Sequence, residues 1–390
     1  MKIKKIALLL SLLACFLYPH AGASVVDIGE DLEFEYRFLE REGDSYSQLR
    51  HRLRLYLKAY LDKNITIGAS IQSAGVADST RTYVNYEGSE VKNKTPFFDL
   101  AYIKVEDIHD MPLSLTIGIQ SLEWLDGLLI SDRGMGLPGL SFRAELPHKI
   151  GVEGYRVMTE DSMKEISSIE GSGLRIMRKF GFMRAEANYL EENYKETEET
   201  TRSIYGAALS REMHQGLEFS LFNYIMDGSI GESSFSASLL GAYGSFEGAV
   251  EPIGKGGAWI RYLRGSGDPD NEKEGFMPVL AYASPDMIGH YYGRHRESGL
   301  SYTAANLDLF SFGIYAHVME GLRVSMTRGL YKSHTPSLPI GGSISFGADY
   351  TYDRIKVNFQ HTIFSPEEDL QFFEGKENKK FITLNVGAKF

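Results

Sequence analysis

Basic side chains lie on the polar face of several predicted strands, and they are the residues of this chain best suited to bind a ligand. In one such segment, Arg52, Arg54 and Lys58 alternate with leucine and alanine. Because successive side chains of a β-strand point to opposite sides, the basic groups share one face. Such a row favours an anionic solute, and interleaved tyrosines could contact sugar rings. The candidate binding residues are Arg37, Arg52, Arg54, Tyr56, Lys58, Arg175, Arg184, Arg323, Arg354 and Lys356.

These basic residues also have a purely structural explanation, which stays open. Basic groups can pair with acids on the same face and brace neighbouring strands without selecting any solute. The acids that could serve as partners are Glu33, Glu35, Glu186, Glu218, Asp308 and Asp349. Sequence alone does not decide between a selective row and a braced one.

Catalytic and metal-binding chemistry has weaker support. The segment 290–296 holds His290 and His295, but no cysteine pair or carboxylate accompanies them at the spacing of metal ligands. No Gly-x-Ser-x-Gly segment occurs, and pairing a serine with His214, His290 or His334 would be arbitrary. We therefore predict no enzyme, no catalytic residue, no metal and no cofactor. The alternative is an enzyme that modifies lipids with a Ser/His pair.

Alternation of apolar and polar residues runs through the chain and predicts β-strands. In the C-terminal segment 380–390, Ile382, Leu384 and Val386 share one face and Thr383 and Asn385 the other. Such strands suit a soluble sandwich, whose two sheets bury each other, or a barrel in lipid, whose apolar face points outward. A sandwich gives no reason for so uniformly charged an outer face. The predicted fold is an all-β, transmembrane, antiparallel up-and-down β-barrel.

Composition agrees with a barrel and excludes other classes. The chain holds 23 Tyr, 22 Phe and 40 Gly but only 2 Trp, which suits strands with aromatic girdles at the membrane interfaces. Beyond the N-terminus no segment approaches eighteen consecutive apolar residues, so we expect no spanning helix. A net charge of −11 argues against nucleic acid as a partner. The expected partner is instead the lipid bilayer of the bacterial outer membrane.

The first 23 residues have the order of a cleavable secretory signal. Lys2, Lys4 and Lys5 precede an apolar run that is too short to span a bilayer, and small residues follow. We therefore assign residues 1–23 to a signal peptide and residues 24–390 to the barrel. Cys15, the only cysteine, lies in the signal, so no disulfide stabilises the mature chain. Lipidation at Cys15 is a weaker alternative.

The breaks between the predicted strands differ in length, as they do in outer-membrane barrels with short periplasmic turns and longer outer loops. The short breaks are 62–64, 147–148, 180–181, 319–320 and 351–353. The long breaks are 74–95, 122–139, 160–171, 191–202, 266–306, 332–339 and 365–379. An even number of strands requires that 235–249 form one strand, with a bulge near Leu239 and Leu240. The total is about eighteen, wide enough for an aqueous lumen.

The longest predicted loop and the C-terminal strand each lead to a further prediction. The histidine-rich segment 290–296 lies in the longest loop, where we favour a constriction or a lid folded into the pore. The C-terminal strand ends on Phe390, and it is the segment through which we expect the barrel-assembly machinery to bind. His317 and His361 are assigned to the lipid-facing rows, without a role.

The segment Gly118-Ile119-Gln120-Ser121-Leu122-Glu123-Trp124-Leu125-Asp126-Gly127-Leu128-Leu129-Ile130 resembles the alginate-export family of outer-membrane barrels. Residues 265–269, followed by 276–293, resemble a second stretch of that family. The resemblance implies an eighteen-stranded export pore with a basic lumen and loops that fold over its mouths. Ile119 stands where the family pattern has an arginine, which removes one expected positive charge and puts alginate itself in question.

The predicted function is an outer-membrane channel of the alginate-export type. It would pass anionic solutes, such as acidic sugars, through a partly basic lumen without energy coupling. Two alternatives stay open: the lipid-modifying enzyme, and a structural barrel whose plugged lumen conducts no ions.

Overall fold

The computed structural model describes most of the chain from residue 26 to the C-terminus. The described residues are 26–41, 44–78, 83–84, 97–125, 129–131, 136–159, 169–195, 199–214, 216–250, 254–267, 306–334, 337–367 and 378–390. The signal assigned to residues 1–23 and the segment 290–296 lie outside them. Within the described ranges, no helix has the length and apolar content needed to cross a membrane.

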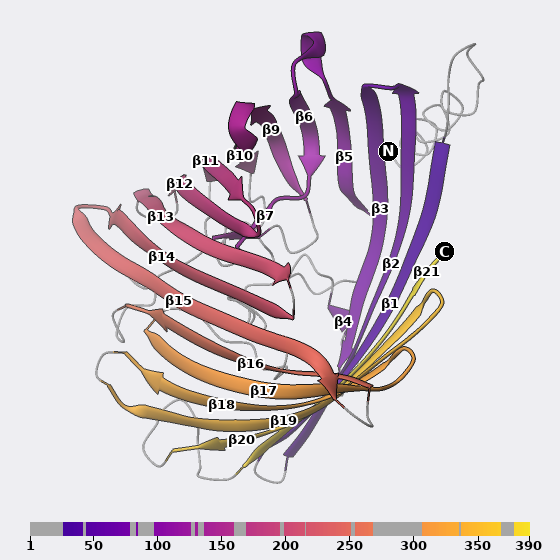
Figure 1. The fold of residues 1–390 in the computed structure, drawn as a ribbon, viewed down its shortest axis with the longest axis vertical. Coiled ribbons are helices and arrows are strands. Elements are labelled where there is room, and N and C mark those ends of the chain that lie inside the picture. Colours follow the sequence, from indigo (N-terminus) through magenta and orange to yellow (C-terminus); the bar gives the residue numbers. More distant parts are fainter. Residues whose placement is uncertain are drawn as a thin grey trace.

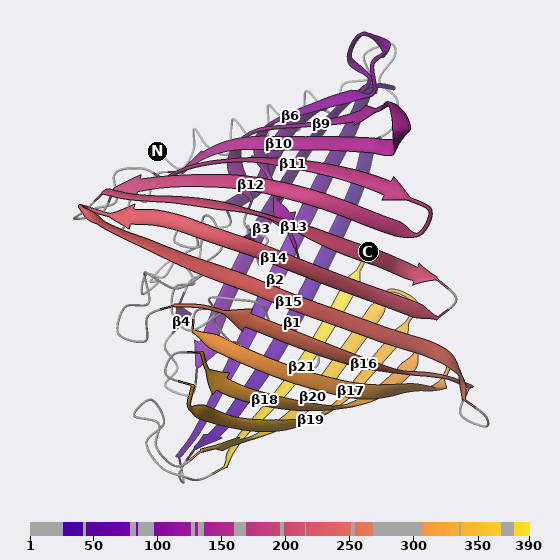
Figure 2. The same cartoon turned by 60° about the vertical axis from the view of Figure 1, so that its left-hand side comes forward.

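Eighteen strands in the described part of the chain form one closed antiparallel barrel (Figures 1 and 2). They are β1 (Val26–Arg41), β2 (Asp44–Asp62), β3 (Ile65–Asp78), β5 (Phe97–Val105), β6 (Leu113–Gln120), β9 (Leu137–Leu146), β10 (Ile150–Thr159), β11 (Ile169–Phe180), β12 (Met183–Lys195), β13 (Glu199–His214), β14 (Leu217–Ile230), β15 (Ser233–Val250), β16 (Gly254–Gly265), β17 (Leu307–Met319), β18 (Leu322–Ser333), β19 (Pro339–Tyr352), β20 (Ile355–Pro366) and β21 (Lys379–Lys389). The predicted fold class and strand number are confirmed.

A few short elements complete the structure. The two-residue strand β4 (Tyr83–Val84) pairs with the end of β3, and β7 (Glu123–Trp124) pairs with β8 (Ile130–Ser131) as a hairpin of its own. The 3-10 helices η1 (Ile108–Asp110) and η2 (Pro147–Lys149) lie in the connections β5–β6 and β9–β10.

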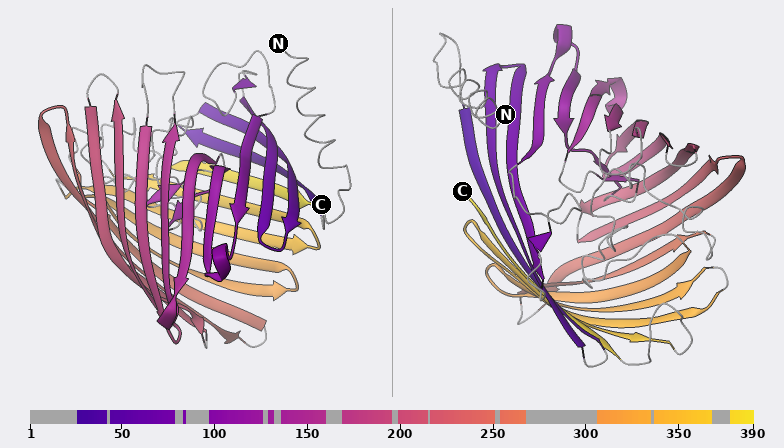
Figure 3. Two further views of the ribbon diagram at one scale, coloured as in Figure 1. Left: turned by 90° about the horizontal axis from the view of Figure 1, so that it is seen from above. Right: turned by 180° about the vertical axis from the view of Figure 1, so that it is seen from behind.

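The C-terminal strand closes the ring. β1 pairs with β2 along one edge and with β21 along the other, and β1 and β21 lie side by side in Figure 3. Leu32 is opposite Ala388, and the backbone amide of Phe390 donates to the carbonyl of Glu30 at 2.9 Å. Closure removes the free sheet edges whose unpaired backbone groups would otherwise meet lipid.

Residues 235–249 lie in one strand, β15, as predicted, but the predicted bulge is absent from its described pairings. The register with β14 runs without a shift from Leu217 opposite Phe246 to Ile230 opposite Ser233. Leu239 and Leu240 suggested a bulge because two successive apolar residues break the alternation. In the structure Leu239 is fully buried inside the barrel and Leu240 is exposed outside, because the interior is itself apolar at this height.

Apolar rows cover the outside of the barrel. Leu55 is 43% exposed and Ile314 is 58% exposed, and within the described part of the chain no second sheet packs against them. Thr66 and Ser70, on the opposite face of β3, are buried. This inversion of the usual soluble pattern excludes the sandwich, because the apolar rows are covered only when lipid surrounds the ring.

The two ends of the barrel differ. One end carries both the start of β1 and the end of β21, together with tight turns such as 63–64, 181–182 and 320–321. Gly321 has a positive φ of 76°, and a Cβ there would collide with the carbonyl of Thr351. The other end holds the longer connections, but the β14–β15 turn at that end has only two residues. Short turns therefore define the periplasmic end.

Candidate functional site

The β7–β8 hairpin folds inside the ring and identifies the inward-facing rows. Trp124 of β7 packs edge-on against Tyr155 of β10, with ring centroids 5.1 Å apart. The guanidinium carbon of Arg175 on β11 lies 4.8 Å from the Trp124 ring centroid. The row that contains Tyr155 and Arg175 therefore faces the lumen, and the strand registers carry this assignment around the barrel.

On the wall built by β1 to β12, inward arginines lie against carboxylates. Arg52 on β2 contacts Glu33 on β1 at 2.5 Å, and Arg184 contacts Glu186 at 2.9 Å, both on β12. Arg175 on β11 binds Glu153 on β10 through its Nε at 3.1 Å and through a second guanidinium nitrogen. Each of these three arginines has a negative charge beside it, so the far field of each pair is small.

Arg54 contacts a buried acid that the sequence analysis missed. Its guanidinium lies 2.5 Å from Asp99 and donates to Gln72 at 2.9 Å. Asp99 is 0% exposed and also accepts a hydrogen bond from Ser70. A register shift between β3 and β5 places this carboxylate inside. The only sign of this partner in the sequence is that Asp99 is flanked by apolar residues in the segment 97–101.

On the opposite wall, two inward arginines lie over aromatic rings. The guanidinium carbon of Arg323 on β18 is 4.3 Å from the Tyr315 ring centroid, and that of Arg261 on β16 is 5.4 Å from the Tyr243 centroid. Tyr315 donates its hydroxyl to Glu247 at 3.0 Å. Among the described residues neither Arg261 nor Arg323 forms an ion pair. A ring orients a guanidinium without cancelling its charge.

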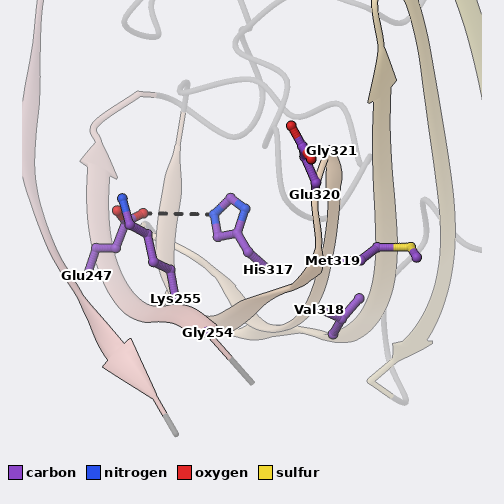
Figure 4. Close-up of a pocket in the computed structure, with 8 residues that line it drawn as sticks. All are labelled: Glu247, Gly254, Lys255, His317, Val318, Met319, Glu320 and Gly321. Carbon is purple, nitrogen blue, oxygen red and sulfur yellow. Dashed lines mark ion pairs between the residues drawn. The ribbon is translucent and has the colours of Figure 1, made fainter. Parts of the chain in front are cut away.

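A pocket of about 510 Å³ opens at the periplasmic end of this wall (Figure 4). Lys255 on β16 and His317 on β17 are cross-strand neighbours there, and His317 Nε2 lies 3.9 Å from Glu247 on β15. The prediction that His317 faces lipid is therefore wrong. Since Ala316 belongs to the outward row, the next residue must point inward. His361 does lie on an outward row, opposite Phe346.

The remaining candidate residues are more scattered. Tyr56 donates to Asp31 at 2.7 Å, and the Lys58 ammonium lies 5.4 Å from the Tyr60 ring centroid. Both line a second pocket of about 370 Å³ at the periplasmic end, beside Phe390. Lys356 is on an inward row opposite Gly387.

Several assignments differ from expectation or lie outside the described residues. Arg354 lies in the turn between β19 and β20, outside the strands. The side chains of Arg37 and Glu35 lie outside the described residues. Asp308 is on an outward row, next to Arg264, and so is not an acid of the lumen. Ile119 is also outward, opposite Ala101, so an arginine at that position would not have added to the lumen charge.

The interior near the outer loops is largely apolar apart from the buried ion pair between Arg202 and Glu192 at 2.7 Å, which the sequence analysis did not predict. Leu190, Ile204, Met226 and Leu309 point inward from four different strands and are fully buried together with the β7–β8 hairpin. The strands carry apolar residues on both faces here, so alternation gave no signal. Among the described residues, no cluster of three histidine, cysteine or acidic side chains could hold a metal ion.

No protein-family model and no curated protein sequence matches the chain. Solved structures match over almost the whole chain. OccK2 (OpdF) of Pseudomonas aeruginosa, in complex with glucuronate, has a TM-score of 0.62 at 10% identity and covers 94% of this chain and 98% of its own. Acinetobacter baumannii OccAB1 has a TM-score of 0.62 at 11% sequence identity, and the match covers 94% of this chain and 97% of OccAB1. Pseudomonas aeruginosa OpdQ has a TM-score of 0.57 at 9% sequence identity, and the match covers 94% of this chain and 99% of OpdQ.

Identities this low establish a shared fold and leave the substrate open. The neighbours are porins rather than enzymes, and none of the comparisons shows the alginate-export family. A closed ring of strands with apolar rows outside and charged rows inside is built for a bilayer. The chain thus has the fold of the outer-membrane porins, and its place is the bacterial outer membrane.

Proposed function

We propose that the protein is a passive outer-membrane channel for anionic solutes, with acidic sugars as the expected class. The observation that carries the proposal is that the guanidinium groups of Arg261 and Arg323 lie over tyrosine rings and, among the described residues, form no ion pair, although Asp349 is the cross-strand neighbour of Arg323. Charges of one sign in a pore with low-dielectric walls raise the local concentration of counter-ions. The paired arginines of the opposite wall add little to this field.

Acidic sugars are the first solutes to test for two reasons. The similar structure of OccK2 contains glucuronate, a sugar that carries a carboxylate. In this chain, tyrosine rings lie beside the cations, so a solute could present a carboxylate to Arg323 and a ring face to an aromatic side chain. Export of an acidic polymer such as alginate is the narrower form of the proposal, and the segment that begins at Gly118 supports it by resemblance.

Single-channel currents across planar bilayers test the proposal. We expect glucuronate to reduce the current at millimolar concentration and glucose, the matched neutral sugar, to leave it unchanged. The variant Arg261→Gln/Arg323→Gln should raise the glucuronate concentration for half-block about tenfold, which corresponds to about 1.4 kcal/mol. The matched control Glu33→Gln/Arg52→Gln removes one cation together with its acid and should behave as the wild type. Equal block by both sugars would contradict the proposal.

A structural barrel without conductance is the second candidate, and the buried apolar interior favours it. Leu190, Ile204 and Met226 occupy space that would be aqueous in an open pore. Eighteen strands usually leave a water-filled channel, so the apolar interior has to narrow it substantially. Absence of any current from folded, reconstituted protein would establish this reading. An assay for phospholipase activity on the same sample covers the lipid-modifying alternative.

A further inference from the structure

A group of cations lies on the outside of the barrel, at the end that carries the longer loops. Asp308 on β17 accepts the Nε of Arg264 on β16 at 2.8 Å and a second guanidinium nitrogen at 3.3 Å. The Lys332 ammonium on β18 lies 3.6 Å from the same carboxylate, and His334 Nδ1 lies 3.5 Å from it. We call Arg264, Asp308, Lys332 and His334 the rim cluster.

The strand registers place the rim cluster at the upper edge of the apolar band. Arg264, Asp308 and Lys332 are aligned across three neighbouring strands. The next outward positions below Asp308 on β17 are Phe310 and Phe312, both exposed. Ten residues of a strand tilted by about 40° rise about 26 Å, close to the height of the apolar band of such barrels. The ten residues of β17 that follow Asp308 therefore span the bilayer and leave the cluster at its outer surface.

The cluster has more positive than negative charge. Asp308 is the only carboxylate that contacts it among the described residues, and it is 4% exposed. Arg264 is 42% exposed and Lys332 is 50% exposed, so both cations still present donors to the surroundings. One acid cannot neutralise two permanent cations, so at least one positive charge faces the membrane surface.

Arg328 adds a further positive charge from below. It lies on the same outward row of β18 as Lys332, opposite Ile344 on β19. A Cβ at Gly342 would come within 2.8 Å of an Arg328 guanidinium nitrogen, so the side chain runs over this glycine toward the outer end. Long cationic side chains on a lipid-facing surface direct their charge to the interface in this way. Among the described residues Arg328 forms no ion pair.

Other outward polar groups near the same end differ in charge. On β10 and β11, Arg156 contacts Glu170 at 3.5 Å, which makes a neutral pair. On β13 and β14, Tyr205 donates to Asp227 at 2.8 Å, which leaves a negative group. Among the described residues, the surplus of positive charge over β16 to β18 therefore contrasts with these two other outward groups.

We propose that the rim cluster, with Arg328, binds the phosphate groups of a lipid headgroup in the outer leaflet of the membrane. Guanidinium groups bind phosphate through two parallel hydrogen bonds, and the ammonium of Lys332 supplies a third donor. Acyl chains of the same lipid would contact the apolar row below, which includes Phe310 and Leu330. This site does not depend on the solute of the lumen, so the two proposals can fail independently.

The test titrates purified, folded protein in detergent with three probes and counts bound lipid by native mass spectrometry. The probes are bisphosphorylated lipid A, its dephosphorylated form and inorganic phosphate. We expect the phosphorylated lipid to bind and its dephosphorylated form to bind at least about tenfold more weakly. Each cation near a membrane surface contributes about 1 kcal/mol, or about fivefold, so Arg264→Gln/Lys332→Gln should weaken binding about 25-fold.

Controls separate a lipid site from a brace between strands. Arg156→Gln, at the same end but in a neutral pair, should bind lipid A as the wild type does. Asp308→Asn should bind more tightly, because it removes the opposing charge; a loss as large as that of the double variant would overturn the proposal. If the double variant does not fold, Arg328→Gln, which does not contact Asp308, carries the test with an expected fivefold loss.

Two further results would overturn the assignment. Equal retention of the phosphorylated and dephosphorylated lipids would show that phosphate is not recognised. Inorganic phosphate that binds as tightly as the lipid would show a site for free anions rather than for a headgroup.

Discussion

The two walls of the lumen use the same residue type in opposite ways. Arg52, Arg175 and Arg184 lie against carboxylates, whereas Arg261 and Arg323 lie over tyrosine rings without an ion pair among the described residues. Both walls carry arginines on strands whose side chains alternate between the two faces. Only the strand registers reveal what stands opposite each one. A row of cations along a strand therefore does not by itself indicate the field that a solute would meet.

The difference also separates stability from selectivity. A charge that is buried with a partner becomes costly when that partner is removed. A cation over a ring in a partly open lumen can be removed at a cost of about 1 kcal/mol. The wall of paired arginines should therefore respond to mutation mainly by losing stability, and the wall of stacked arginines mainly by losing selectivity.

The largest expected effect comes from breaking the buried ion pair between Arg54 and Asp99. Arg54→Gln leaves Asp99, which is fully buried, without its cation, and should lower the free energy of unfolding by about 3–5 kcal/mol. Urea unfolding in detergent micelles measures it. Restoring most of the loss with Asp99→Asn on top of Arg54→Gln would confirm charge burial as the cause. An unchanged unfolding midpoint would show that water already reaches the site.

A smaller effect is expected when the Tyr315 hydroxyl is removed. Tyr315→Phe keeps the ring under Arg323 but removes the donor to Glu247, and should cost about 1 kcal/mol in unfolding free energy. Because the ring stays, ion selectivity should not change. Tyr315→Leu serves as the contrasting variant, since it removes the ring as well. If Tyr315→Phe altered selectivity as much as Tyr315→Leu, the ring would not be the feature that matters.

The smallest expected effect on stability converts a paired arginine into a free one. Glu33→Gln releases Arg52 in a half-exposed pair, so the free energy of unfolding should change by at most about 1 kcal/mol. Anion preference in a salt gradient should nevertheless rise, because one more positive charge is left uncompensated. A decrease in anion preference would mean that Glu33 does not screen Arg52.

Much of the fold was predictable from local pattern. The alternation in 380–390 indicated a lipid-facing closing strand, and parity required 235–249 to be one strand. The bulge prediction failed because it assumed a polar interior, whereas Leu239 packs into an apolar one. Alternation along a strand shows which side chains share a face. It does not show whether that face meets a polar or an apolar interior.

The site was less predictable, because it depends on register. Asp99 becomes a partner of Arg54 only through an irregular β3–β5 pairing, and Asp308 turns outward with its whole row. His317 is different: the alternation that assigned Ala316 to lipid already implied an inward histidine. Arg261, the second stacked cation, carried no distinguishing signal, since its tyrosine partner comes from the neighbouring strand.

The reversal potential across a planar bilayer with a potassium chloride gradient tests the central claim most directly. Wild-type protein should prefer chloride, Arg261→Gln/Arg323→Gln should lose that preference, and the variant Glu153→Gln/Arg175→Gln, which leaves the net charge unchanged, should keep it. A wild-type potential of zero, or an equal change in both double variants, would contradict the account of a lumen with one compensated and one selective wall.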